Sequence, residues 1–449
     1  MNVGGPLHEL EVDEAMRLCV PSTWHDQLLA TFSEFGFCHT LADIPIHPLL
    51  LDAELLETSA YKLRRVMQLA RYLATELHPD RAPVRHDHLA VVAAYRDAPR
   101  RPLIGRPDCV IHRGTLKILE LNIGSGVGGV QEIDTIVKAY RRSGLEHILS
   151  VSIQSPFDSQ IELIRCQLET VEKKSVVIVP LADFGRLYLD QSDRLASQVK
   201  ERLNVRAKTV FPEAMRTSTW LTDGQEEFGL FYQDACFLHE PSMLIGMREA
   251  LLAARTTRTI VLGDPLDIGV DDKGALALVS EYLDNARRGA SEFSDLEGIV
   301  PWTRLMRRKT TSAFGELVNL KEFVLENKDR LVLKRCASHV GKHVYIGSRT
   351  DDALWRDIVE RTYHPTAGDW IVQEFVHSDQ LPFWFRSESG QLLLRRSGGT
   401  IGPFLFGDAS DGWLVRIQGE TTSDDEVLAL PTDGNIGITT VAAVDRKGV

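Results

Sequence analysis

Residues 106–129 read RPDCVIHRGTLKILELNIGSGVGG, and this stretch decides how the rest of the chain is interpreted. Two runs of β-strand character, 109–112 and 116–122, flank an Arg-Gly turn. Such a pattern predicts a β-hairpin, which here leads directly into a loop with several glycines. We therefore expect two paired strands here, with the glycine-rich loop at the end of the second strand.

Polar residues interrupt the second run of this hairpin. Glu120 and Asn122 alternate along it, so both side chains are expected on one face of the sheet. A carboxylate beside an amide oxygen suits Mg²⁺, which takes a few oxygen ligands and keeps water or phosphate for the rest. The glycines that follow offer backbone N–H groups to an anion. An edge strand with solvated polar residues is the structural alternative.

A second motif is basic. The run 331–334 predicts a strand that ends in Lys334, and a short loop carrying Lys342 and Gly341 leads to another strand at 343–346. A lysine at a strand end and a basic loop can hold and cover phosphates. The stretch lacks the P-loop ending and the dinucleotide fingerprint, so those two classes are disfavoured. A basic hairpin on an acidic protein stays open as the alternative.

The strand predicted at 370–376 carries a third motif. Its apolar run is interrupted by Gln373 and Glu374 before Phe375, as at an apolar slot whose edges can hydrogen-bond to adenine. A strand that becomes exposed at its end is an equally common alternative. Lys273, at the start of a predicted helix, and Arg416, within a later strand, complete the candidates. Either of these two charges alone is more typical of a solvated side chain.

The chain of 449 residues divides by pattern into three segments. Residues 1–149 combine helical periodicity with the hairpin, 150–265 predict a small parallel α/β domain with a β-α-β unit at 175–210, and 266–449 predict antiparallel sheets with packed helices. The expected fold class is therefore α/β with α+β character.

Composition excludes several functions. The net charge is −12 without a long basic block, which disfavours nucleic acid as a partner. The six cysteines are far apart and the histidines show no metal-ligand spacing, as in free thiols of a reducing compartment. No apolar stretch of about 18 residues suggests a membrane span, and no nucleophile elbow is present. We expect a soluble, cytoplasmic protein.

Taken in order, these motifs resemble the ATP-grasp ligases, specifically the circularly permuted group that includes eukaryotic-type glutathione synthetase and its bacterial relatives. The resemblance runs from about residue 106 to the C-terminus. It is carried by 106–108, 119–122, 128–129, 264–265 with Lys273, 300–304, 332–341, 370–374 and 414–416, and in the middle domain by 190–191, 222–225 and 231–234.

The resemblance implies a circularly permuted ATP-grasp fold with a small parallel α/β substrate domain, and an ATP- and Mg²⁺-dependent carboxylate–amine ligase that works through an acyl phosphate. Its substrates would be amino acids or small peptides, and a homodimer stays open. For Mg²⁺, the resemblance implies Glu120 and Asn122. For the nucleotide, it implies Lys273, Lys334 and Lys342 at the phosphates, and Gln373, Glu374 and Phe375 at adenine and ribose. For the substrate, it implies Arg106, Ser125, Gln191 and Gln233, with Arg416 at a substrate carboxylate or phosphate. Arg106, Arg416 and Lys334 form the implied catalytic set.

Two positions depart from the family pattern. Ser338 stands where the phosphate loop usually carries an acidic metal ligand, and Gln233 stands where glutathione synthetases hold a peptide carboxylate with an arginine. We therefore expect a substrate other than γ-glutamylcysteine, with a γ-glutamyl dipeptide as the first product to test. A glutathionylspermidine synthase-like polyamine ligase and a catalytically silent nucleotide-binding regulator remain as alternatives.

Overall fold

The computed structural model describes most of the chain from residue 44 onward, and every structural statement here concerns the residues that it describes. These are residues 30, 44–77, 89–124, 127–149, 151–179, 186–210, 222–223, 226–233, 241–257, 259–270, 273–286, 293–336, 338, 343–364, 369–387, 391–418 and 436–444. Ser125, Lys342 and most of the predicted phosphate loop lie outside them.

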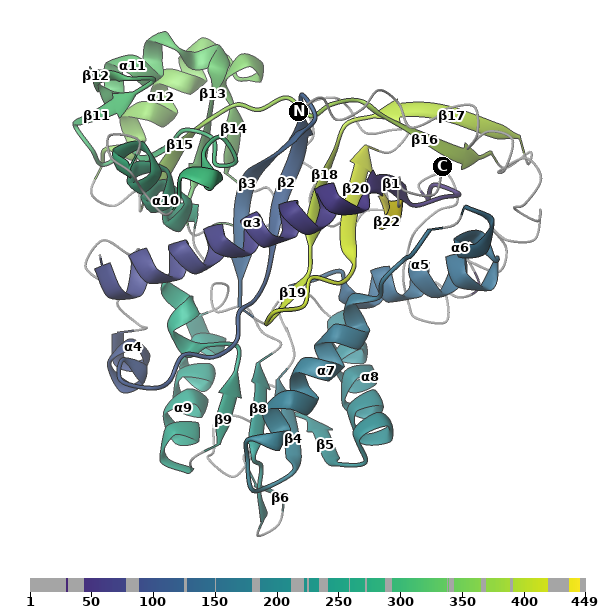
Figure 1. The fold of residues 1–449 in the computed structure, drawn as a ribbon. Coiled ribbons are helices and arrows are strands. Elements are labelled where there is room, and N and C mark those ends of the chain that lie inside the picture. The colour runs from purple at the N-terminus through teal and green to yellow at the C-terminus, as the bar shows by residue number, and fades with distance from the viewer. Residues whose placement is uncertain are drawn as a thin grey trace.

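A six-stranded antiparallel sheet forms the centre of the molecule (Figure 1). Its strand order is β19-β2-β18-β20-β21, with β3 paired to the other edge of β2. The strands are β2 (Ile104–His112), β3 (Thr115–Ile123), β18 (Gly399–Pro403), β19 (Leu405–Phe406), β20 (Trp413–Gln418) and β21 (Ile436–Thr439). The predicted hairpin is confirmed as β2–β3, and its turn residues Arg113 and Gly114 both have positive φ. The sheet joins residues from the first and third predicted segments.

Helices cover both faces of this sheet. On one face lie α3 (Ala53–Tyr72) and α10 (Lys273–Ala286), and on the other lies α5 (Val130–Arg142). Strand β20 shows why two layers form, because Val415 packs with α3 and α10 whereas its neighbour Leu414 packs with α5. Alternate side chains of each strand thus enter opposite cores.

A small parallel sheet lies below the central one in Figure 1, with strand order β5-β4-β8-β9. Its strands are β4 (Ser175–Val179), β5 (Arg206–Thr209), β8 (Leu230–Gln233) and β9 (Ile260–Leu262), and its helices are α7 (Pro156–Glu169), α8 (Arg186–Leu203) and α9 (Pro241–Thr257). Every residue of β4 is buried, as expected for a parallel strand covered on both faces. The predicted β-α-β unit is confirmed.

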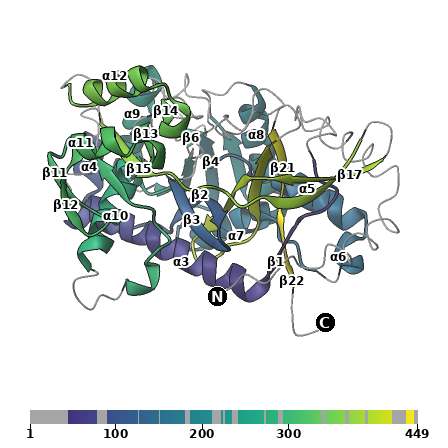
Figure 2. The same cartoon turned by 90° about the horizontal axis from the view of Figure 1, so that it is seen from above.

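The third sheet is antiparallel, with order β10-β15-β13-β14, and packs against α10. It comprises β10 (Thr303–Leu305), β13 (Leu331–Arg335), β14 (Val344–Ile346) and β15 (Trp370–Glu374), with helices α11 (Leu320–Glu326) and α12 (Asp352–Thr362). Figure 2 shows these elements gathered at one end of the molecule.

The remaining regular elements are β1 (Leu49–Asp52), η2 (Leu73–Leu77), α4 (Leu89–Tyr95), α6 (Leu145–Ile148), β6 (Thr222–Asp223), β7 (Glu226–Glu227), η7 (Pro265–Gly269), η8 (Ser294–Leu296), β11 (Thr310–Ala313), β12 (Glu316–Asn319), η9 (Lys328–Arg330), η10 (Gly347–Arg349), β16 (Leu381–Arg386), β17 (Leu392–Ser397) and β22 (Val441–Val444).

The architecture agrees with a mixed class of parallel and antiparallel sheets packed with helices. Among the described helices, none combines the length and the apolar character that a membrane crossing requires. The predicted domain boundaries at 149 and 265 stay a prediction.

Candidate functional site

Lys273, Lys334 and Glu120 come from three different elements and meet at one place. Lys273 is the first residue of α10, Lys334 lies in β13, and Glu120 lies in β3. The Lys273 Nζ is 2.8 Å from the Glu120 Oε1, and it also donates to the Ser338 carbonyl. Both lysines are buried, at 6% and 7% exposure, so neither is a solvated surface charge. Two cations therefore face one carboxylate.

The surroundings of Lys334 hold its ammonium in one position. Its Nζ donates to Gln373 Oε1 at 2.6 Å and to the Leu119 carbonyl at 3.1 Å. Burial lowers the pKa of Lys334 to about 8, while Glu120 acts to raise it and Lys273 to lower it further. Loss of hydration disfavours the charged form, and the nearby carboxylates of Glu120 and Asp108 do not fully compensate.

Gln373 uses both ends of its side-chain amide. Its Oε1 accepts from Lys334, and its Nε2 donates to Thr303 Oγ1 at 3.2 Å across the β10–β15 pair. The Thr303 hydroxyl in turn donates to the Pro301 carbonyl at 2.9 Å. Gln373 is 1% exposed, so this chain of bonds fixes the side chain. Gln373 therefore orients the Lys334 ammonium. Its predicted contact with adenine stays a prediction.

Glu374 is the last residue of the same strand, and Phe375 follows it. The backbone N–H of Glu374 donates to the Trp302 carbonyl at 2.8 Å, and that of Phe375 donates to the Arg330 carbonyl at 2.8 Å. The Glu374 Oε2 accepts from the Trp302 backbone N–H at 3.4 Å. The guanidinium of Arg349 lies 5.7 Å from the centre of the Phe375 ring. In the register of β15 against β13, Glu374 lies opposite Leu331, whereas Lys334 lies opposite Ile371, and so the predicted nucleotide contacts of Glu374 and Phe375 stay a prediction.

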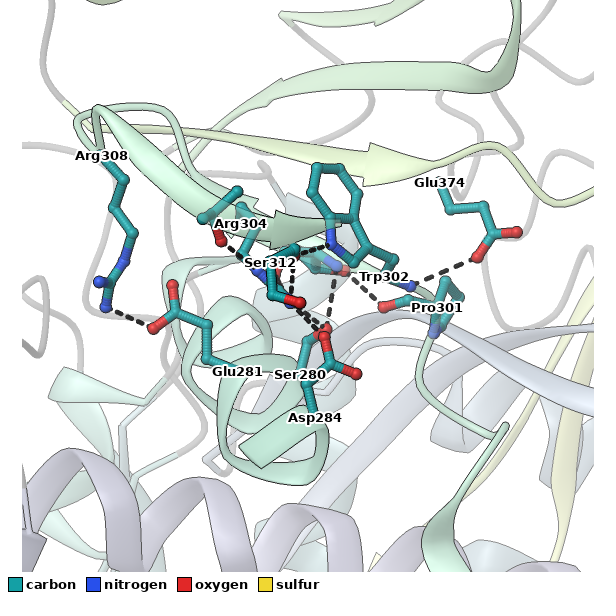
Figure 3. Close-up of polar contacts among 11 residues, drawn as sticks. Ser280, Glu281, Asp284, Pro301, Trp302, Arg304, Arg308, Ser312 and Glu374 are labelled. Carbon is teal, nitrogen blue, oxygen red and sulfur yellow. Dashed lines mark hydrogen bonds and ion pairs between the residues drawn. The ribbon is translucent and has the colours of Figure 1, made fainter. Parts of the chain in front are cut away.

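A buried arginine ties the third sheet to α10 (Figure 3). Arg304 donates to Thr311 Oγ1 at 2.8 Å, to Ser280 Oγ at 3.0 Å and to the Ser312 carbonyl at 3.0 Å, and it pairs with Asp284. Ser280 and Asp284 belong to α10, which begins with Lys273. The Arg304 network thus sets the position of the Lys273 helix relative to the strands that carry Lys334 and Gln373.

A second charged cluster lies on the central sheet. Asp108 accepts from Arg106 Nε at 3.2 Å and pairs with Arg416 at 2.7 Å. Burial alone would raise the pKa of Asp108, but Arg416 and Arg106 hold it at about 2. Arg416 also donates to Thr400 Oγ1 at 2.9 Å. The two predicted substrate-binding arginines are thus brought together by a carboxylate between them.

Arg106 also contacts the glycine-rich segment. Its guanidinium donates to the Gly128 carbonyl and lies 5.7 Å from the centre of the Phe404 ring. Gly129, the N-cap of α5, has φ +98°, and an added Cβ would approach Leu414 to 3.2 Å, so glycine is required there. Asn122 donates from Nδ2 to the Arg106 carbonyl at 2.8 Å, which fixes the side chain of this predicted metal ligand.

Two of the other predicted substrate residues, Gln191 and Gln233, lie in the small α/β unit. Gln191 of α8 reaches the start of α5, where its Nε2 donates to Glu132 Oε1 at 3.1 Å and its carbonyl accepts from Gln131. Gln233 is buried at the end of β8 and pairs in register with Val179.

The donor set suits ATP phosphates and, with them, Mg²⁺. Two buried ammonium groups beside one carboxylate leave an excess of positive charge, which a phosphate balances. In the described part of the chain, no group of three His, Cys, Asp or Glu side chains is placed to hold a metal ion. A divalent ion at Glu120 would thus take most of its oxygen ligands from phosphate and water.

Asp108 and Glu132 are site residues to which the sequence reasoning gave no role. Asp108 stands in the Arg-x-Asp motif, and residues two apart on a strand share a face, so a contact with Arg106 was foreseeable. Its contact with Arg416 was not foreseeable from the sequence, because Asp108 and Arg416 come together only when β18 pairs with both β2 and β20. Glu132 could not be recognised from the sequence, because an acidic residue in the first turn of a helix is common.

Comparison with known proteins gives evidence on the fold alone. No protein-family model and no curated protein sequence matches the chain. Among solved structures, the chain is similar to a glutathione synthetase like-effector from Globodera pallida in its apoform, with a TM-score of 0.56, 11% identity, and coverage of 95% of this chain and 99% of that one. A putative gamma-glutamylcysteine synthetase from Methylobacillus flagellatus aligns with a TM-score of 0.43 and 12% identity over 83% and 86% of the two chains. The first likeness shows that nearly the whole chain shares the fold of a glutathione synthetase-like protein.

Proposed function

We propose that the chain is an ATP-dependent carboxylate–amine ligase of the circularly permuted ATP-grasp type, which joins amino acids or small peptides through an acyl phosphate. The observation that carries this proposal is the meeting of Glu120, Lys273 and Lys334. These residues are 214 positions apart at the extreme (334 − 120), yet they form one buried site with excess positive charge. The fold of a glutathione synthetase-like protein supports the same class.

The chemistry explains why such a site is needed. A carboxylate is a poor electrophile, and its phosphorylation supplies a good leaving group for attack by an amine. The phosphoryl group carries negative charge throughout, so transfer requires fixed cations in a place that excludes water. Lys273 and Lys334 are buried and held by hydrogen bonds, and so they need little reorganisation. Mg²⁺ held by Glu120 and Asn122 would neutralise further phosphate charge when bound.

The second charged cluster supports recognition of a substrate anion. Arg106 and Arg416 share one carboxylate, Asp108, so the cluster keeps a net positive charge. Guanidinium groups bind carboxylates with two parallel hydrogen bonds and are suited to orient one. In this proposal the cluster holds the carboxylate of an amino-acid substrate. Gln233 is neutral and favours a second substrate that is less anionic than γ-glutamylcysteine.

The proposal is tested by incubating the protein with ATP, Mg²⁺ and pooled amino acids, followed by mass spectrometry for γ-glutamyl dipeptides. ADP release together with a dipeptide is the expected result. Glu120→Ala should abolish product formation in a protein that still folds, with a lowered free energy of unfolding because the buried Lys273 loses its carboxylate partner. Wild-type turnover in this variant would rule out the Mg²⁺ assignment.

Other outcomes point to the other classes. Release of ADP only when spermidine is added would favour a polyamine ligase. Binding of ATP with no ADP release under any substrate pool would favour a nucleotide-binding regulator.

A further inference from the structure

Glu132 is a buried carboxylate with one oxygen that the fold does not satisfy. It is the third residue of α5 and is 5% exposed. Its Oε1 accepts from Gln191 Nε2 at 3.1 Å, whereas its Oε2 is buried and has no hydrogen-bond partner in the described part of the chain. Buried polar groups are nearly always hydrogen-bonded in native proteins, so this atom requires an explanation.

The electrostatic surroundings of Glu132 do not remove the cost of burying it. Burial raises the pKa of Glu132, while its own backbone N–H, the hydrogen bond from Gln191 and the positive charges of Arg106 and Arg194 act to lower it, and the pKa stays raised. A carboxylate stripped of water and left with an unfilled acceptor destabilises the fold. Such arrangements are more frequent at functional sites than in structural cores.

The position of Glu132 connects the parts of the proposed site. Helix α5 begins directly after the segment 127–129, whose Gly128 carbonyl accepts from Arg106. Gln191 reaches Glu132 from α8 of the small α/β unit. Glu132 therefore lies where the central sheet and the small unit meet, next to Arg106 and Gln191, two residues for which the family resemblance implies substrate binding.

We propose that the Oε2 atom of Glu132 binds the ammonium group of an α-amino acid substrate. This inference rests on the proposed ligase function and adds a recognition residue to it. An ammonium group supplies the donor that Oε2 lacks, and it neutralises the buried charge. Arg106 and Arg194 place positive charge around the same carboxylate. That field favours a zwitterion, whose carboxylate balances the cations, over a polyamine, which they repel.

The first test needs no ligand. Glu132→Gln keeps the shape of the side chain and removes the buried charge, so the melting temperature should stay unchanged or rise. Asp134→Asn is the matched control in the same helix, because Asp134 is buried and fully paired with Lys138, Arg194 and Ser155. That variant should lose several degrees. An equal loss in Glu132→Gln would make Glu132 a structural residue and overturn the inference.

The second test measures binding by calorimetry with each of the common amino acids, with their deamino analogues, and with ATP. For the amino acid that the wild type binds, Glu132→Gln should weaken binding about tenfold or more, as expected for a lost charge-assisted contact. Binding of the deamino analogue and of ATP should be the same in both proteins. This difference between ligands separates recognition of the ammonium group from a general disturbance of the site.

Two results would overturn the inference. One is equal affinity of wild type and Glu132→Gln for the amino acid. The other is binding of spermidine in place of any amino acid. Either result, if ATP still binds and ADP is still released, leaves the ligase proposal standing. Absence of ATP binding would instead count against the proposed function itself.

Discussion

In the proposed site, the buried charge of Lys334 is expected to make ATP binding depend on pH. Its pKa is lowered to about 8, so the fraction of charged ammonium falls as the pH rises through 8. We expect the affinity for ATP to decrease from pH 7 to pH 9. Lys334→Met should lose about 1–3 kcal/mol of binding free energy at pH 7 and should show no such decrease.

The control for this prediction is Lys321→Met. Lys321 is 39% exposed and pairs with Glu360 on the surface of the same part of the molecule. Its replacement should leave ATP affinity unchanged, since exposed ion pairs contribute little. Calorimetric titrations at several pH values measure both variants, and a parallel pH dependence in Lys334→Met would show that another group titrates.

Asp108 is expected to matter for stability because it compensates two buried arginines. Asp108→Asn should lower the free energy of unfolding by about 3–5 kcal/mol, since Arg106 and Arg416 would lose their shared countercharge. The exposed Asp357→Asn, which breaks only the surface pair with Arg361, should cost about 1 kcal/mol or less. Urea unfolding at pH 7 compares the two, and equal losses would contradict the role of Asp108.

The same carboxylate predicts an acid dependence. The pKa of Asp108 in the folded protein is about 2, below its ordinary value of 3.8. Its stabilising contribution is therefore complete above pH 4 and is lost as the pH falls toward 2. The difference in stability between wild type and Asp108→Asn should shrink over this range.

At the scale of elements, Arg304 links α10 to the β10–β15 pair (Figure 3). Arg304→Lys keeps the charge but cannot form the forked contacts with Thr311, Ser280 and Asp284. We expect a loss of about 3 kcal/mol in stability and weaker ATP binding, because the Lys273 helix would no longer be fixed against β13. Thermal melts and calorimetry measure both effects.

Arg165→Lys serves as the control, because Arg165 is exposed and pairs only within the surface of α7. It should change neither quantity. Full ATP affinity in Arg304→Lys, despite lowered stability, would separate the Arg304 network from the site.

Many elements were predictable from local sequence because their signals are local. The β2–β3 hairpin, the β4-α8-β5 unit and strand β13 agree with prediction to within a few residues at most ends. The predicted start of β2 was five residues late. Gly105 and Pro107 are poor strand formers, yet Gly105 is needed because a Cβ there would come within 2.5 Å of the Asn122 carbonyl. The close approach of β3 overrides local propensity.

At the scale of the whole molecule, pairings between distant segments were beyond the reach of periodicity. Strand β18 lies between β2 and β20, and β1 pairs in parallel with β22, although about 390 residues separate the members of the latter pair. No local pattern encodes a partner so far away. The order of motifs in a resembling family did place Glu120, Lys273 and Lys334 together, whereas the contacts of Glu132 became visible only in the fold.

We propose that these distant segments assemble the ATP phosphate site of a ligase. Its most direct test is the rate of ADP release in the presence of Mg²⁺ and pooled amino acids, compared among wild type, Lys334→Met and the surface control Lys321→Met. We expect release that depends on amino acids in the wild type and in Lys321→Met, and at least a hundredfold loss in Lys334→Met, roughly what removal of a charge-stabilising group costs. Undiminished release in a folded Lys334→Met, or none in the wild type, would contradict it.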